Sequence, residues 1–227
     1  MPSHRSIGLG LVAAGAAIGA LIPVFLALYP AAGLAPADAG KPAALLAVVA
    51  RTPALFVVPG LLEIAGHVVG AIAILGLWWR LGRESFALSA ATVAGLAWMA
   101  VDVLDNALAL QLVPKLAASH AAGDTAAAGT FGVIGSLIDG IRLGGHLAGG
   151  LWVVGASTVL VRARAIHPVV GYAGVVVGAV LAANPIVPAL LNVSFMTLPA
   201  WLVLFGIAVA RLDGQGARVA ALTRVSA

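Results

Sequence analysis

The sequence contains no cysteine and little charge. Its 227 residues include 12 lysine and arginine residues and 8 aspartate and glutamate residues, so charged side chains make up 9% of the chain, against about 25% in soluble domains. The absence of cysteine excludes disulfides, thiolate catalysis and metal or iron–sulfur sites built on cysteine. No hydrophilic block is long enough to form a soluble domain. We therefore expect residues 1–227 to form a single membrane domain.

Long apolar segments take the place of the missing polar ones. Hydrophobic residues make up 62% of the chain and the mean hydropathy is +1.12, and about 20 apolar residues are enough to cross a bilayer. The sequence therefore predicts an all-α membrane protein. We expect a bundle of six transmembrane helices, at residues 7–29, 53–79, 86–112, 131–161, 169–191 and 192–210.

The remaining segments carry weaker signals. A short interfacial helix is predicted at 43–50, a polar loop rich in alanine and glycine at 113–130, and a loose tail at 211–227. The charged start and apolar core of the first span also resemble a cleaved signal peptide. Its apolar core is longer than the roughly 7–15 residues of such signals, which favours an uncleaved span.

Lysine and arginine residues are divided unevenly between the two sides of the predicted bundle. Lys41, Arg51 and Lys115 fall on the side opposite the termini. The larger set lies on the side of the termini and comprises Arg5, Arg80, Arg83, Arg162, Arg164, Arg211, Arg218 and Arg224. Cytoplasmic segments are enriched in basic residues, so we expect a multi-pass protein of a cell inner membrane with both termini cytoplasmic. Short basic turns of this kind suit anionic lipid headgroups, and we expect no nucleic acid partner.

Ionisable and amide side chains lie inside four of the predicted spans. Such groups are costly at membrane depth and indicate functional sites by default. Each ionisable group lies about seven to fifteen residues from the outer end of its span, so at about 1.5 Å per residue these groups form one layer. The second span carries Glu63 and His67, the third Asp102, Asp105 and Asn106, the fourth Asp139, Arg142 and His146, and the fifth Asn184.

The charges of this layer do not balance. Four carboxyl groups face the single guanidinium of Arg142, so a fully ionised layer with neutral histidines would carry a charge of −3. That charge is untenable at low dielectric without a bound proton, a bound cation, a charged histidine or water. Glu63, Asp102 and Asp139 are therefore candidate proton carriers or general acids, with Arg142 tuning them.

Two cofactor hypotheses use the same layer. His67, His146, Glu63 and Asp105 would provide the nitrogen and oxygen ligands of a divalent metal. The two histidines, level with each other on different helices, would also suit axial ligation of haem, but no further haem signature supports that alternative.

A structural alternative needs no cofactor. Arg142 would then be neutralised by Asp139 or Asp102, and the other polar groups would form hydrogen bonds between helices. If the layer is instead a binding site, Asn106 and Asn184 would complete a polar pocket.

Three short motifs lie at the predicted cytoplasmic turn or end of a span. They are Trp78-Trp79-Arg80-Leu-Gly-Arg83, Leu151-Trp152-x-x-Gly155 and Arg164-Ala-Ile-His167-Pro168-Val-Val-Gly171-x-x-Gly174. With the hydropathy pattern, they resemble a broad family of uncharacterised bacterial six-helix membrane proteins, classed as a domain of unknown function. The resemblance implies the six-helix fold and its topology, and it implies no activity and no site residues.

Three functions fit the polar layer. Proton- or cation-linked transport or binding of a small solute is favoured, because Asn184-Pro185 and Pro188 interrupt the fifth span and interrupted helices line binding sites. The alternatives are a membrane-embedded enzyme that acts on a lipid or isoprenoid by acid or metal catalysis, and an accessory subunit of a membrane complex. The expected partners are the lipid bilayer, a small-molecule or lipid ligand, and a second copy of the chain in a homo-oligomer.

Overall fold

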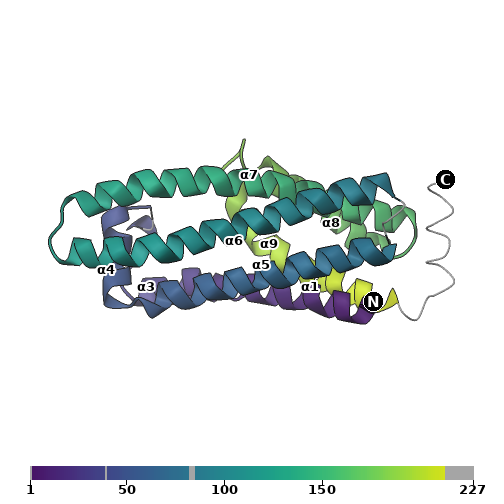
Figure 1. Ribbon diagram of the computed structural model, residues 1–227, viewed down its shortest axis with the longest axis horizontal. Coiled ribbons are helices and arrows are strands. Elements are labelled where there is room, and N and C mark those ends of the chain that lie inside the picture. Colours follow the sequence, from purple (N-terminus) through teal and green to yellow (C-terminus); the bar gives the residue numbers. More distant parts are fainter. Residues whose placement is uncertain (1, 39, 82–84, 213–227) are drawn as a thin grey trace.

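The computed structural model describes residues 2–38, 40–81 and 85–212, and this part of the chain consists of helices joined by short turns (Figure 1). The predicted loose tail falls almost entirely outside the described residues, as does most of the turn after Leu81. The elements are α1 (His4–Gly19), α2 (Leu21–Pro23), a π-helical segment η1 (Val24–Leu28), α3 (Tyr29–Ala31), a 3-10 turn η2 (Pro36–Asp38), α4 (Pro42–Arg51), α5 (Ala54–Leu81), α6 (Phe86–Ala121), α7 (Ala126–Arg162), α8 (Pro168–Ala183) and α9 (Leu190–Ala210).

Five helices are long and apolar enough to cross a membrane. They are the continuous helix from His4 to Ala31, which joins α1 to α3, and α5, α6, α7 and α9. The structure thus has the architecture of a multi-pass, all-helical membrane protein. The count of six spans and the cytoplasmic location of the termini stay predictions.

The fifth predicted span is shorter in the structure than expected. Helix α8 has 16 residues, which at about 1.5 Å per residue is about 24 Å, shorter than a hydrocarbon core of about 30 Å. Its end at Ala183 confirms the predicted interruption at Asn184-Pro185, because proline lacks the N–H that would continue the helix. The chain resumes a helix only at Leu190, so α8 and α9 are separated by an apolar turn.

The loop predicted over residues 113–130 is mostly helical, and this expectation was wrong. Helix α6 continues through Pro114 to Ala121 and α7 begins at Ala126, because alanine has the highest helix propensity of all residues. The turn itself depends on Gly123, whose φ of 94° lies in the left-handed region that ends helices. The predicted short helix at 43–50 is confirmed as α4.

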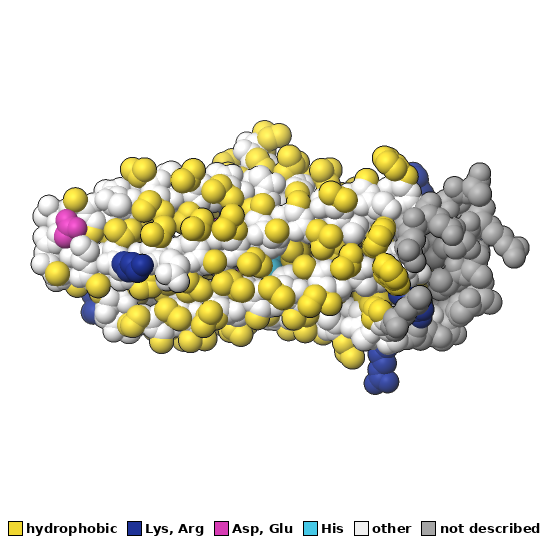
Figure 2. Space-filling model, in the orientation of Figure 1, with side chains coloured by type: hydrophobic (Ala, Val, Ile, Leu, Met, Phe, Trp, Pro, Cys, Tyr) yellow, Lys and Arg dark blue, Asp and Glu magenta, His cyan; other side chains and the backbone are white. Residues whose placement is uncertain are grey.

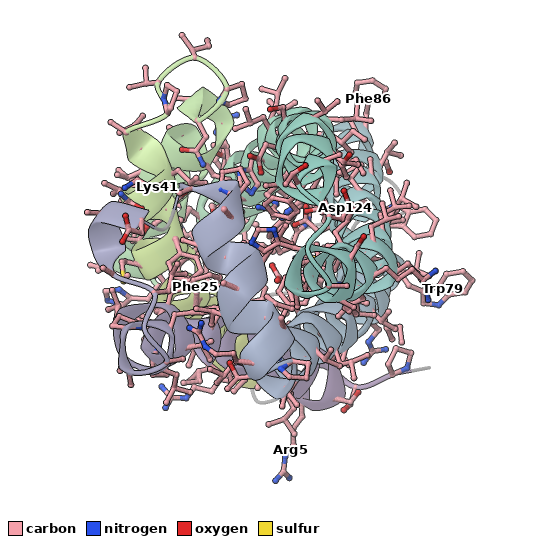
Figure 3. The ribbon with its side chains drawn as sticks, turned by 90° about the vertical axis from the view of Figure 1, so that its left-hand side faces the viewer. Arg5, Phe25, Lys41, Trp79, Phe86 and Asp124 are labelled. Carbon is pink, nitrogen blue, oxygen red and sulfur yellow. The ribbon has the colours of Figure 1, made fainter. Side chains whose placement is uncertain are left out.

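Helix α4 lies across the end of the bundle that the α6–α7 turn forms, and Figure 3 views the molecule from this end. Its buried residues Leu46 and Val49 pack against Val113 and Ala117 of α6. We call this the α4 end. At the opposite end, called the basic end, lie the start of α1 and the ends of α5, α7 and α9, which carry Arg5 and three further exposed arginines: Arg80, Arg162 and Arg211.

Six helices surround the core as a closed ring, in the order α1, α5, α6, α7, α8, α9 and back to α1. Two of these contacts bring backbones together at glycines. A Cβ on Gly206 of α9 would lie 2.6 Å from the carbonyl oxygen of Gly8 on α1, and one on Gly178 of α8 would lie 2.8 Å from that of Gly150 on α7. Small residues permit such close approach between membrane helices. The ring is therefore closed by its first and last helices.

Aromatic side chains fill the part of the ring nearer the basic end. Trp152 is fully buried between Trp98, Trp201 and Phe205, with ring centroids 6.0–6.2 Å away. The outer surface is different: Figure 2 shows hydrophobic side chains over most of the visible face, as expected of helices that contact lipid. The interior of the ring is thus solidly packed on the basic side of the polar layer.

Candidate functional site

The polar side chains meet at a cavity of about 70 Å³ inside the ring. This volume exceeds the roughly 10–15 Å³ that one water molecule requires. Its polar lining comes from five helix-borne side chains: Glu63 and His67 of α5, Asp102 of α6, His146 of α7 and Ser194 of α9. The rest of the wall is apolar and is contributed by α1, α6, α8 and α9. The sequence-predicted layer is therefore a site in space as well as a pattern along the chain.

His67 has both ring nitrogens engaged. Its Nε2 lies 2.9 Å from Oδ2 of Asp102, and its Nδ1 lies 2.7 Å from the backbone carbonyl oxygen of Glu63. A carbonyl oxygen only accepts, so Nδ1 carries a hydrogen. The bond between Nε2 and Oδ2 holds one further proton, on either the imidazole or the carboxyl group. In both cases His67 and Asp102 together are neutral.

A second pair neutralises Arg142. Its Nε donates to Oδ2 of Asp105 over 2.7 Å, and the Asp105 side chain is 0% exposed. The Arg142 side chain is 39% exposed, and its Nη1 also lies 3.5 Å from Oδ1 of Asp139. The alternative that Arg142 is neutralised by Asp102 is therefore wrong, because Asp102 is paired with His67.

Asp139 lies outside the buried cluster, which corrects the expectation that it faces the interior with Arg142 and His146. Its side chain is 68% exposed. The physical reason is the short α8: Asn184, directly after α8, contacts His146, and Asp139 lies seven residues, or about 10 Å, further along α7. The six-helix ring has ended at this depth, so nothing equivalent to α8 covers Asp139.

Asn184 joins three helices at the wall of the cavity. Its Nδ2 donates to Ser194 Oγ of α9 over 2.8 Å and lies 3.3 Å from Nδ1 of His146. Ser194 Oγ in turn donates to the carbonyl oxygen of Leu191 over 2.9 Å. This chain of bonds makes His146 Nδ1 an acceptor and directs its other nitrogen, Nε2, to carry the hydrogen of the neutral ring.

The cavity is lined by Ser194 and not by the predicted Asn106. Asn106 is buried, but its Nδ2 donates to the backbone carbonyl of Asp102 on its own helix over 2.9 Å and it does not line the cavity. Ser194 does line the cavity, and sequence reasoning missed it. The available signal was its position across the proline break from Asn184, because the two ends of a helical hairpin lie side by side.

Glu63 is the cavity-lining acid that has no hydrogen-bond or ion-pair partner among the described residues. Its side chain is half-buried and lines the cavity. Among the described residues, its carboxylate has no hydrogen-bond or ion-pair partner, whereas Asp102 is paired with His67 and Asp105 with Arg142. The charge imbalance seen in the sequence therefore reduces to one carboxylate in the cavity, because Asp139 lies outside it.

The geometry does not support the tentative metal site. In the described part of the chain, no three histidine, aspartate or glutamate side chains form a group that could hold a metal ion. Asp105 bonds to Arg142, and His67 would have to give up Asp102 or the Glu63 carbonyl to become a ligand. The same engagement of His67 weighs against axial ligation of haem.

Aromatic rings close the cavity on the side of the basic end. Trp98 lines the cavity and packs edge-on against His67, with ring centroids 6.1 Å apart, and Trp152 lies directly behind it. These rings close the route towards the basic end.

The family resemblance suggested by the short motifs stays a prediction. In comparisons with known proteins, no protein-family model, curated protein or solved structure matches this chain.

Proposed function

We propose that this protein binds and moves a small solute or cation across a membrane together with protons, and that Glu63 is the proton- or cation-carrying group. The observation that carries the proposal is the isolation of the Glu63 carboxylate. It lines a cavity inside a helical ring while both neighbouring acids, Asp102 and Asp105, already have cationic or imidazole partners. An unpaired carboxylate in such a half-buried site must take up a proton or a cation, or be hydrated.

The surroundings of Glu63 support a carrier role. The helix pair α8–α9 is interrupted at the level of the cavity, and Asn184 and Ser194 at the break contact its wall. Interrupted membrane helices commonly border binding sites in transporters. The aromatic packing behind Trp98 separates the cavity from the basic end, as a carrier closed on one side requires.

The first test is whether Glu63 takes up a proton. Purified protein in a zwitterionic lipid bilayer would be compared at acidic and alkaline pH by infrared difference spectroscopy. We expect a protonated-carboxyl band that disappears in Glu63→Gln and persists in Asp139→Asn. The second variant is the matched control, because it also removes one carboxylate from a neighbouring helix but at an exposed position.

The transport step needs a second measurement. Vesicles containing wild-type protein and an internal pH-sensitive dye would be given an inward proton gradient. We expect proton entry that Glu63→Gln abolishes and Asp139→Asn retains. An unchanged carboxyl band and an unchanged proton flux in Glu63→Gln would refute the proposal.

One observation favours a second candidate, an enzyme that acts on a lipid or isoprenoid. The cavity wall includes Leu191, which lies in the first turn of α9 and is 40% exposed. An apolar substrate would enter there and meet Glu63 as a general acid. Conversion of added isoprenoid by wild-type protein, lost in Glu63→Gln and independent of any proton gradient, would favour this function over transport.

A further inference from the structure

The cavity has two chemically different sides. Helices α5 and α6 contribute the carboxyl groups of Glu63 and Asp102, whereas α9 contributes the apolar side chains of Phe195, Leu198 and Pro199 beside the single hydroxyl of Ser194. A bare metal ion would require oxygen or nitrogen ligands on all sides. A ligand that touches both sides must therefore carry a polar group at one end and carbon at the other.

The charge of that polar group follows from the pairs around it. Asp102 with His67, and Asp105 with Arg142, are each neutral, so Glu63 leaves one negative charge to be matched. Asp102 adds an acceptor, because its Oδ1 is buried and has no hydrogen-bond partner. An anionic or zwitterionic ligand would need a free cationic side chain, and Arg142 does not line the cavity.

We infer that the cavity binds a small organic monocation, an ammonium group with a short apolar substituent. The ammonium would lie between the Glu63 carboxylate and Asp102, and the substituent would lie against Phe195 and Leu198. Trp98 contributes a further apolar ring to the wall of the cavity. The cavity volume of about 70 Å³ limits the substituent to a few carbon atoms. This inference rests on the proposed role of Glu63 as a carrier.

Protons and the organic cation then compete for one carboxylate. Binding of the cation to protonated Glu63 releases one proton, so its affinity falls as the pH is lowered. The ionisable groups that face Glu63 from the surrounding helices are His67, Asp102, Asp105, Arg142 and His146. All except His146 belong to the pairs described above, and proton release must be lost in Glu63→Gln if it comes from Glu63.

The experiment uses three probes of nearly equal size: propylammonium, propanol and propionate. Their binding to the full chain in nanodiscs of zwitterionic lipid would be measured by calorimetry in two buffers of different ionisation enthalpy, with empty nanodiscs as the control for partitioning. We expect propylammonium to bind at least tenfold more tightly than propanol or propionate and to release up to one proton.

Three variants complete the test. Glu63→Gln should weaken propylammonium binding at least tenfold, whereas Glu63→Asp should keep the preference for the cation and Asp139→Asn should match wild type. Equal affinity for propylammonium and propanol in wild-type protein would overturn the inference, even if the glutamine variant failed to fold.

The failure of this inference is distinguishable from failure of the proposed function. If the Glu63 carboxyl band titrates but propylammonium does not bind preferentially, Glu63 carries protons and the organic-cation inference is wrong. If the band is also missing, both are wrong.

Discussion

The pair formed by Arg142 and Asp105 gives the sharpest prediction for stability. Replacing Arg142 with glutamine leaves the Asp105 carboxylate, which is 0% exposed, without the Nε donor that lies 2.7 Å from it. Removing one member of a fully buried ion pair costs about 3–5 kcal/mol of stability, whereas exposed pairs contribute about 0.2–1 kcal/mol. Arg142 is 39% exposed, so we expect a loss of about 2–3 kcal/mol, between these limits.

A second variant shows whether the loss of stability in Arg142→Gln arises from the Asp105 carboxylate that is left without its partner. Asp105→Asn alone should cost less than Arg142→Gln, because the guanidinium retains solvent access and Asp139 at 3.5 Å. The double variant should recover most of the loss, since neither buried charge remains. The expected coupling free energy is therefore about 2–3 kcal/mol, within the range of contacting residues in double-mutant cycles.

The assay is equilibrium unfolding in mixed detergent micelles, followed by the circular dichroism of the helices, for wild type, both single variants and the double variant. The cycle is valid if all four proteins elute as the same species before unfolding. Additive effects of the two substitutions, within about 0.3–0.5 kcal/mol, would refute the pairing of Arg142 with Asp105.

Two further predictions follow from glycine packing and from the turn between α6 and α7. Gly206→Ala should destabilise the protein by about 1–3 kcal/mol in the same unfolding assay, because its Cβ would meet the Gly8 carbonyl oxygen at 2.6 Å, whereas Gly144→Ala, with no atom within 4 Å of its Cβ, should not. Hydrogen bonds from Ser119 and the backbone hold the pKa of Asp124 below its usual value of 3.8, so the turn is stabilised above that value and loses this contribution as the pH falls below it. The protection factors of the amides in the turn, which correct for the intrinsic pH dependence of exchange, should therefore be lower at pH 3 than at pH 6 in wild type, and Asp124→Asn should show no such difference.

The sequence predicted the helices better than their ends. Apolar composition locates a membrane crossing, but a helix continues wherever its backbone bonds are satisfied, and alanine-rich segments satisfy them in water as well. This is why α6 and α7 extend through most of the predicted loop around Pro114, and why α8 stops at Ala183, before its predicted end, where Asn184-Pro185 interrupts the helix.

The sequence predicted which residues belong to the candidate site better than it predicted which of them pair with each other. Depth along each helix brought Glu63, Asp102 and His146 together correctly, because helix rise is uniform. Helical spacing alone also grouped Asp139 with them, and it failed there because burial depends on which neighbouring helix reaches that depth. The partner of Arg142 likewise depends on the rotation of α6 relative to α7, which no single helix specifies.

The contact between α1 and α9 has a consequence for biosynthesis. The surface of α1 that includes Gly8 packs against Gly206, and α9 begins at Leu190, about 170 residues after α1 ends. At a synthesis rate of about 5–20 residues per second, α1 waits roughly 10–40 s in the membrane for its partner. Because α8 and α9 complete the wall of the cavity with Leu181 and Ser194, nascent chains that lack them carry a carboxylate layer open to lipid. Such unfinished chains would be natural substrates for membrane quality control.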